Sequence, residues 1–163
     1  MAVENPLFDK ADWYFEDALT NYIYSYNLEN KELTKDDYRE VHRWAANHIG
    51  FFVTWLIQHD AKEMMTPDEE TSLQSVKDEQ TLGVDYALDW CDGKLGTMDV
   101  KKDFQDFVNN YYEHQYMKDY SEFVVNDLYD LPLEFLGSWE DYHLFAPVID
   151  QAYVDYLGGK RFH

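Results

Sequence analysis

The chain has 163 residues, which suits a single domain over 1–163 that buries roughly two-thirds of its unfolded surface. Hydrophobic residues make up 45% and aromatic residues 18%, which argues against a mostly disordered chain. Its 33 acidic residues against 13 lysines and arginines give a net charge of −20, which repels nucleic acid and anionic membranes and so excludes proteins that bind either directly.

The first predicted elements are an N-terminal segment, whose secondary structure the sequence leaves open, and one long helix. Residues 12–27 fit a helix, but their tyrosine and isoleucine content also suits a short strand or an irregular segment. Residues 34–63 are predicted to form a helix that begins at the N-cap Thr34. Asp36 and Asp37 fall in its first turn, where the helix dipole favours acidic side chains.

The next stretch carries a clear helix start. Thr66 and Glu69 form an S/T-x-x-E capping box, and Pro67 takes the first helical position. Two shorter helices follow, with Gly83 and the segment "CDGKLG" marking their boundaries.

The last third is predicted to be helical as well. A long helix is expected over 97–123 with Thr97 as its cap, and another is expected from Ser138. Pro147 is expected to restart the chain as a final helix that ends at the glycine pair 158–159. The predicted fold is therefore all-α, a compact multi-helix bundle around the buried helix at 34–63.

That central helix carries two adjacent apolar stripes at helical spacing, so most of its circumference should be buried. Gly50 is then expected where another helix comes close. His48 lies among Trp44, Phe51 and Trp55 in the sequence, so we expect it to be buried, with hydrogen-bond partners for its ring nitrogens.

The sequence gives little support for a metal site or for a catalytic nucleophile. The chain has no H-E-x-x-H motif and only one E-x-x-H, Glu140 with His143, where a di-iron bundle needs two. Cys91 is flanked by Asp89 and Asp92 at a predicted helix end, which should raise the pKa of its thiol. We therefore expect no metal, no cofactor and no catalytic residue.

Tyrosines are unusually frequent on the helix predicted at 97–123. Core packing explains most of them, but buried tyrosine hydroxyls need polar partners. A network that joins them to His48 would be either a ligand pocket or a satisfied interior, and the interior is the favoured interpretation. The aromatic residues concerned are Phe104, Phe107, Tyr111, Tyr112, Tyr116, Tyr120 and Phe123.

Compartment follows from cysteine use and from the N-terminus. A single cysteine allows no internal disulfide, which fits a reducing cytosol. The opening "MAVENPLFDK" lacks the basic and apolar regions of a signal peptide, and the uncharged stretch 44–59 is too short and too polar to span a bilayer. We expect a cytoplasmic protein, either a monomer or a homodimer.

The sequence resembles a bacterial family of acidic proteins that carry a domain of unknown function, DUF7832. The resemblance rests on an A-x-H-I-G-x-F-x-x-W pattern over 46–55, the D-G-K-L turn, the tyrosine-rich helix and an A-P-x-I-D element near the end. The family pattern carries a histidine where this chain has Tyr14, beside the matching Asp9 and Trp13. The resemblance implies no activity; it gives weight to His48, Gly50, Trp55 and Asp60.

Two functions remain open. The first is a non-enzymatic protein that binds a basic partner, as an immunity protein or a DNA mimic does, through exposed carboxylates such as Asp103 and Asp106. The alternative is an enzyme or a small-ligand-binding protein with a pocket around His48. The candidate residues for that pocket, or for a structural network in its place, are His48, Asp9, Trp13, Trp55 and Asp60.

Overall fold

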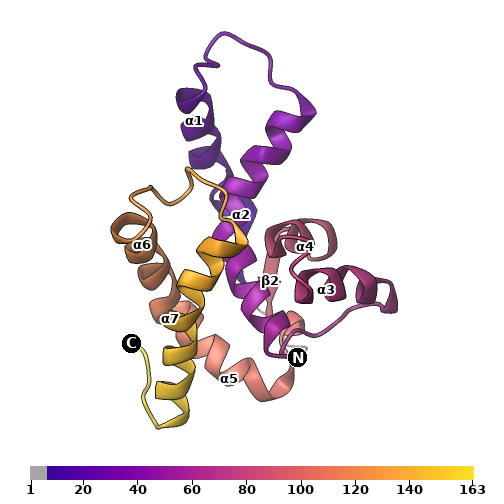
Figure 1. The fold of residues 1–163 in the computed structure, drawn as a ribbon, viewed down its shortest axis with the longest axis vertical. Coiled ribbons are helices and arrows are strands. Elements are labelled where there is room, and N and C mark those ends of the chain that lie inside the picture. Colours follow the sequence, from indigo (N-terminus) through magenta and orange to yellow (C-terminus); the bar gives the residue numbers. More distant parts are fainter. Residues whose placement is uncertain (1–6) are drawn as a thin grey trace, which may run out of the picture.

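The computed structural model describes residues 7–163 as a mostly helical fold with one small two-stranded sheet (Figure 1). Part of the N-terminal stretch assessed for a signal peptide, residues 1–6, lies outside the described residues. The helices and strands are β1 (Leu7–Lys10), α1 (Phe15–Ser25), α2 (Lys35–Gln58), α3 (Glu70–Lys77), α4 (Gly83–Trp90), β2 (Lys94–Gly96), α5 (Lys102–Tyr111), α6 (Met117–Asn126) and α7 (Trp139–Leu157). Shorter turns are η1 (Ala11–Trp13), η2 (Pro67–Glu69), η3 (Thr97–Asp99) and the π-helical turn η4 (Tyr112–Tyr116).

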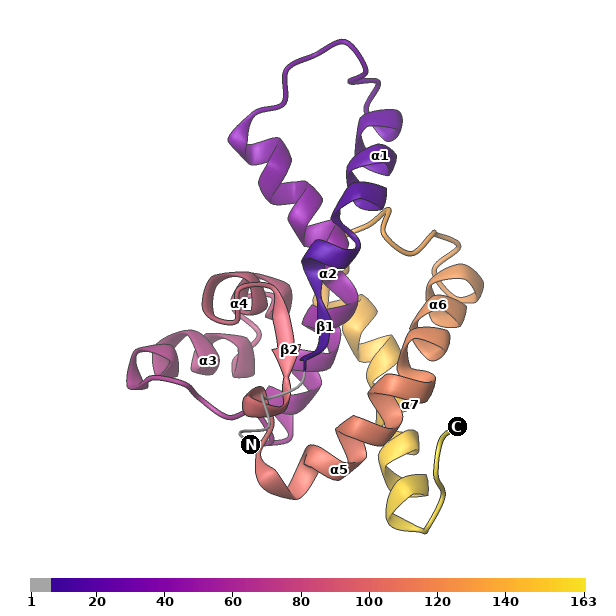
Figure 2. The ribbon, with the colours of Figure 1, turned by 180° about the vertical axis from the view of Figure 1, so that it is seen from behind.

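The predicted central helix is confirmed. Every residue of α2 from 44 to 57 is buried, because neighbours cover it on all sides. α3 and α4 lie on one side of α2, and α5, α6 and α7 lie on the other, while α1 packs against its first half (Figures 1 and 2). Two apolar clusters result, a large one around the second half of α2 and a smaller one between α1 and its first half.

The start of α2 is as predicted, but its end is not. The Thr34 hydroxyl accepts from the Asp37 backbone N–H, and the Asp37 carboxylate accepts from the Thr34 N–H, which completes a capping box. The helix ends at Gln58 rather than at residue 63, because Asp60 takes a positive φ of 54° and turns the chain. The turn brings Lys62 into the interior beside Asp99.

The N-terminal segment resolves into a strand followed by a helix. The strand β1 lies before residue 12, and most of the stretch for which helix and strand were both open forms α1. β1 pairs antiparallel with β2, with Leu7 opposite Gly96 and Lys10 opposite Lys94. Figure 2 shows this small sheet lying along α2.

The helix predicted over 97–123 is wrong at its start and is not uniformly α-helical. Thr97 begins η3, and α5 starts only at Lys102, because the Asp99 carboxylate accepts from the Gly96 N–H and closes a separate turn. The π-helical turn η4 then separates α5 from α6.

The other helix starts are confirmed, with one correction. Thr66 and Ser138 each cap as predicted, with Glu69 and Asp141 completing the boxes. Pro147 does not restart a helix; it lies inside α7. The missing N–H of one proline removes a single hydrogen bond, and the turns on both sides continue the helix.

Two glycines allow α2 and α4 to touch backbone to backbone. A Cβ on Gly50 would lie 2.6 Å from the Cα of Val84, and a Cβ on Gly83 would lie 2.7 Å from the Gly50 carbonyl oxygen. The expectation that another helix approaches Gly50 is therefore confirmed, and the helix is α4.

Substituting Gly50→Ala should lower the free energy of unfolding by about 1–3 kcal/mol, because the new methyl group meets backbone atoms of α4 that cannot move alone. Gly158→Ala is the control, since its Cβ would lie an ordinary 3.4 Å from its nearest neighbour. Urea denaturation of both variants measures the difference. Equal stability of Gly50→Ala and the unsubstituted protein would show that the contact is not tight.

Candidate functional site

A carboxylate and an imidazole meet in the interior between β1 and α2. Asp9 is 1% exposed and His48 is 0% exposed, and Nε2 of His48 lies 3.0 Å from Oδ2 of Asp9. Tyr112 donates its hydroxyl to the same oxygen at 2.6 Å, and the Tyr14 hydroxyl also hydrogen-bonds Asp9. We call these four residues the Asp9 cluster. The Lys10 backbone N–H donates to Oδ1 of the Asp9 carboxylate at 2.9 Å, so both of its oxygens are hydrogen-bonded.

The π-helical turn η4 aims the tyrosines at α2. Inward residues recur every four positions from Val108 through Tyr112, Tyr116 and Tyr120 to Val124, and such a spacing drifts by about 40° per step around an α-helix. The wider π turn takes up part of that drift. Tyr112 and Tyr116 consequently stack with their ring centroids 4.6 Å apart, and the Tyr116 hydroxyl donates to the backbone carbonyl of His48.

Hydrogen bonds keep Asp9 ionised, and burial keeps Tyr112 protonated. Burial alone would raise the pKa of Asp9, but the hydrogen bonds from His48, Tyr112 and Tyr14 hold it below its ordinary value. Burial and the Asp9 charge raise the pKa of Tyr112 well above 10, so its hydroxyl remains a donor. With Asp9 ionised, Nε2 of His48 carries the hydrogen that points at it.

The other face of the imidazole is apolar. Within residues 7–163, Nδ1 of His48 has no hydrogen-bond partner. The Tyr14 ring packs edge-on against the imidazole with centroids 4.5 Å apart. Because Asp9 and His48 are enclosed, the cluster fastens β1 to α2 and η4. The expected partner for each ring nitrogen is therefore missing at Nδ1 within the described residues, and the enclosure of Asp9 and His48 favours a structural network over an open pocket.

The remaining candidate residues lie apart from this cluster. Trp55 is buried and donates its indole N–H to Asp150 of α7 at 2.8 Å. Trp13 is 56% exposed, and Asp60 is exposed and paired with Lys77. The structure therefore brings together Asp9 and His48 and separates the others from them. Tyr14 and Tyr112 contact Asp9 instead. The four-residue spacing of buried residues on α5 and α6 is the sequence feature that points to Tyr112.

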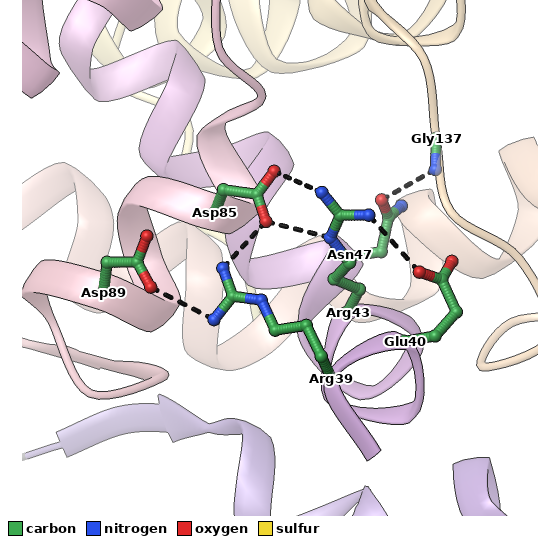
Figure 3. A network of polar contacts seen from close by, with 7 residues as sticks. All are labelled: Arg39, Glu40, Arg43, Asn47, Asp85, Asp89 and Gly137. Carbon is green, nitrogen blue, oxygen red and sulfur yellow. Dashed lines mark hydrogen bonds and ion pairs between the residues drawn. The ribbon is translucent and has the colours of Figure 1, made fainter. Parts of the chain in front are cut away.

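An ion-pair network ties α2 to α4 (Figure 3). The guanidinium of Arg43 binds Asp85 with two hydrogen bonds of 2.9 and 2.7 Å, and it lies 3.3 Å from Glu40. Arg39 donates to Asp85 at 2.9 Å and to Asp89 at 3.1 Å. Two of the few arginines are thus occupied within the fold.

A second buried polar group lies under α4 and η3. Lys62 is 3% exposed, and its Nζ lies 3.5 Å from Asp99 and donates to the Glu63 carbonyl at 2.6 Å. Burial raises the pKa of the neighbouring Cys91 thiol to about 12, in the direction predicted. A thiol held neutral in this way is a poor nucleophile.

The carboxylates expected on an interaction surface face outward. Asp103 and Asp106 are both exposed on α5, and neither forms an ion pair with any residue of the part described here, 7–163. By contrast, Lys77 and Lys94 are paired with Asp60 and Asp92. Lys101 and Lys102 are also exposed at the start of α5, so Asp103 and Asp106 share this stretch with two cations.

A wide groove of about 670 Å³ runs between α7 and the C-terminal segment. Lys160, Arg161 and His163 line it together with Asp119 and Asp155. Charges of both signs are present, so the groove favours no single class of ligand.

Two further observations concern metals and membranes. Among residues 7–163, no three histidine, cysteine, aspartate or glutamate side chains converge as metal ligands. None of the helices in the described part combines the length and apolarity that a membrane-spanning segment needs.

The family "Domain of unknown function (DUF7832)" matches residues 7–132, and the chain belongs to this family. The matched part contains all of the Asp9 cluster and ends before α7. The chain matches no curated protein and no solved structure.

Acid should weaken the fold through Asp9. Its pKa in the folded protein lies below its unfolded value of about 4, so its stabilisation is present above that pH and is lost as pH falls through the folded value. Asp9→Asn should cost about 1–3 kcal/mol at neutral pH and should flatten the loss of stability in acid. Urea denaturation between neutral and acidic pH measures both, with the exposed Asp103→Asn as control. An unchanged acid dependence in Asp9→Asn would contradict this role.

Base should weaken the fold through the buried tyrosines. Their pKa values are raised, chiefly by burial, so their contribution is present below about pH 10 and is lost as pH rises through the folded values. We expect part of the tyrosinate absorbance to appear only together with loss of the helical circular dichroism signal. Ionisation of all 14 tyrosines in a protein that keeps its native signal would contradict the burial. The tyrosines concerned are Tyr14, Tyr22, Tyr86, Tyr111, Tyr112, Tyr116, Tyr120 and Tyr142.

Proposed function

We propose that this protein is a non-enzymatic binding module that engages a basic protein through its acidic surface. The partner class would be a cytoplasmic basic protein that is inhibited when bound, as a toxin is by an immunity protein or a nucleic-acid-binding protein by a DNA mimic. The observation that carries the proposal is the excess of acidic residues: only 13 basic residues stand against 33 acidic ones, five of the 13 are paired with carboxylates of the same chain, and many carboxylates face water.

The pairing is selective. Arg39, Arg43, Lys62, Lys77 and Lys94 each contact a carboxylate of the same chain. These pairs involve five of the 13 basic residues and six of the 33 acidic ones. They leave the strongly negative net charge almost unchanged.

The interior offers less support for the alternative, a pocket around His48. Asp9 and His48 are at most 1% exposed, and the hydrogen bonds of the Asp9 carboxylate are already made. A substrate would reach His48 only after β1 had left α2. The polar groups of the interior support folding more directly than they support chemistry.

A surface of this kind acts at long range. Opposite charge speeds the encounter of two proteins and selects against acidic competitors, and it does so more than it tightens the final complex. Salt screens exposed charges over about 8 Å at physiological ionic strength. The proposal therefore requires that binding weaken steeply as salt is added.

Affinity capture at low salt from lysate of the cells that make the protein tests the proposal. We expect retention of a basic protein that elutes as sodium chloride rises, and a dissociation constant, measured on the purified pair, that increases with salt. Asp103→Asn with Asp106→Asn should weaken this binding more than Glu29→Gln with Glu32→Gln, which removes the same charge from the exposed loop between α1 and α2.

Two results would count against the proposal. One is capture of no basic protein, or of one whose affinity ignores salt. The other is a small-molecule mass adduct in native mass spectrometry that disappears in His48→Ala, which would favour the ligand-binding alternative.

A further inference from the structure

An apolar groove opens on the face formed by β1, β2, η3 and the end of α4. Its volume is about 230 Å³, enough for one large side chain. Four of its lining residues are large apolar side chains that are 36–53% exposed: Leu7, Met65, Trp90 and Met98. Single exposed apolar residues are common on protein surfaces, whereas four from separate segments that line one concavity gather apolar surface as protein interaction sites do.

The residue types fit protein recognition. Tryptophan and methionine are enriched at the centres of protein interfaces, and tryptophan often contributes a large share of the binding energy. Methionine adapts its flexible thioether side chain to differently shaped partners. Met65 and Met98 flank the groove from the loop before η2 and from η3, with Trp90 from α4.

The groove is built on a fixed base. Asp99 lines it, accepts from the Gly96 N–H at 2.8 Å and pairs with the buried Lys62. The Met65 backbone N–H donates to the buried carboxylate of Glu69 at 2.8 Å. These bonds hold the walls before any partner arrives, and preformed sites lose less entropy on binding.

Charge around the groove indicates what would enter it. The Asp92 side chain lines the groove and is 88% exposed. Exposed Glu63 and Asp68 lie on the segment that supplies Met65. Lys94 also lines the groove but is paired with Asp92 at 3.4 Å. An apolar centre with the exposed carboxylates of Glu63 and Asp68 on the adjoining Met65 segment is complementary to an apolar side chain flanked by cations.

We propose that this groove is the docking site for a segment of a basic protein that inserts one large apolar side chain between flanking lysines or arginines. The inference rests on the proposed function and specifies how the partner is held: the acidic surface attracts it, and the Leu7–Met65–Trp90–Met98 groove recognises it.

The test uses two short basic peptides that differ only at their centre, Lys-Arg-Leu-Arg-Lys and Lys-Arg-Gly-Arg-Lys. Titration into protein labelled with ¹³C at the methionine methyl groups reports on the site directly, because Met65 and Met98 line the groove and the half-buried Met117 of α6 lies outside it. We expect the leucine peptide to shift the Met65 and Met98 signals, to leave Met117 unchanged, and to bind roughly tenfold more tightly than the glycine peptide.

A matched pair of variants checks the location. Met98→Ser, at a residue 44% exposed, should abolish the preference for leucine over glycine, whereas Leu144→Ser, a similar change on α7 at a residue 58% exposed, should keep it.

The outcomes separate this inference from the proposed function. Equal binding of both peptides, without selective shifts at Met65 and Met98, would overturn the groove and leave charge-driven binding standing. Binding of neither peptide would count against both. Shifts of Met65 and Met98 that follow protein concentration without peptide would mean that a second copy of the chain fills the groove, which would also overturn the inference.

Discussion

The fold depends on keeping one helix out of water around its whole circumference. Residues 44–57 of α2 are buried without a break, including Asn47, His48 and Thr54, whose polar groups cannot bond to solvent. Protein partners reach most of these groups: Tyr120 for Asn47, Asp9 for Nε2 of His48 and the Gly50 carbonyl for Thr54, while Nδ1 of His48 has none among residues 7–163. The small sheet, the π-helical turn and the close glycine contact with α4 all supply either cover or a hydrogen bond to this helix.

Much of this arrangement can be predicted from the sequence because its signals are local. The capping boxes at Thr34, Thr66 and Ser138 form within a few residues. The two apolar stripes of α2 predict that this helix is buried. The prediction is wrong where a turn has no strong signal in the sequence. α2 stops at Gln58 with the positive φ of Asp60, and the chain beyond it brings Lys62 to Asp99, a contact that the sequence does not reveal.

The Asp9 cluster likewise has one part that the sequence predicts and one part that it does not. Burial of His48 and its need for partners follow from its neighbours on the helix, and Asp9 was among the candidates. The hydrogen bond from Tyr112 to Asp9 cannot be derived from the sequence, because it joins positions 103 residues apart and depends on the π-helical turn. Trp13 and Asp60 were candidates for the same site, and the structure places both on the surface, where a solvated helix end was the preferred interpretation for Asp60. Charge, in contrast, is a property of the whole composition and needs no fold to be recognised.

The boundary of the family match has a consequence for how the molecule holds together. The match ends at residue 132, but the core does not: α7 covers Phe51 and Trp55 of α2 with Phe145 and Tyr153. Residues 7–132 are thus not a closed folding unit in this chain, because Phe51 and Trp55 would lose part of their cover without α7. A homologue with the matched part alone would need another segment, or a second molecule, to shield that side.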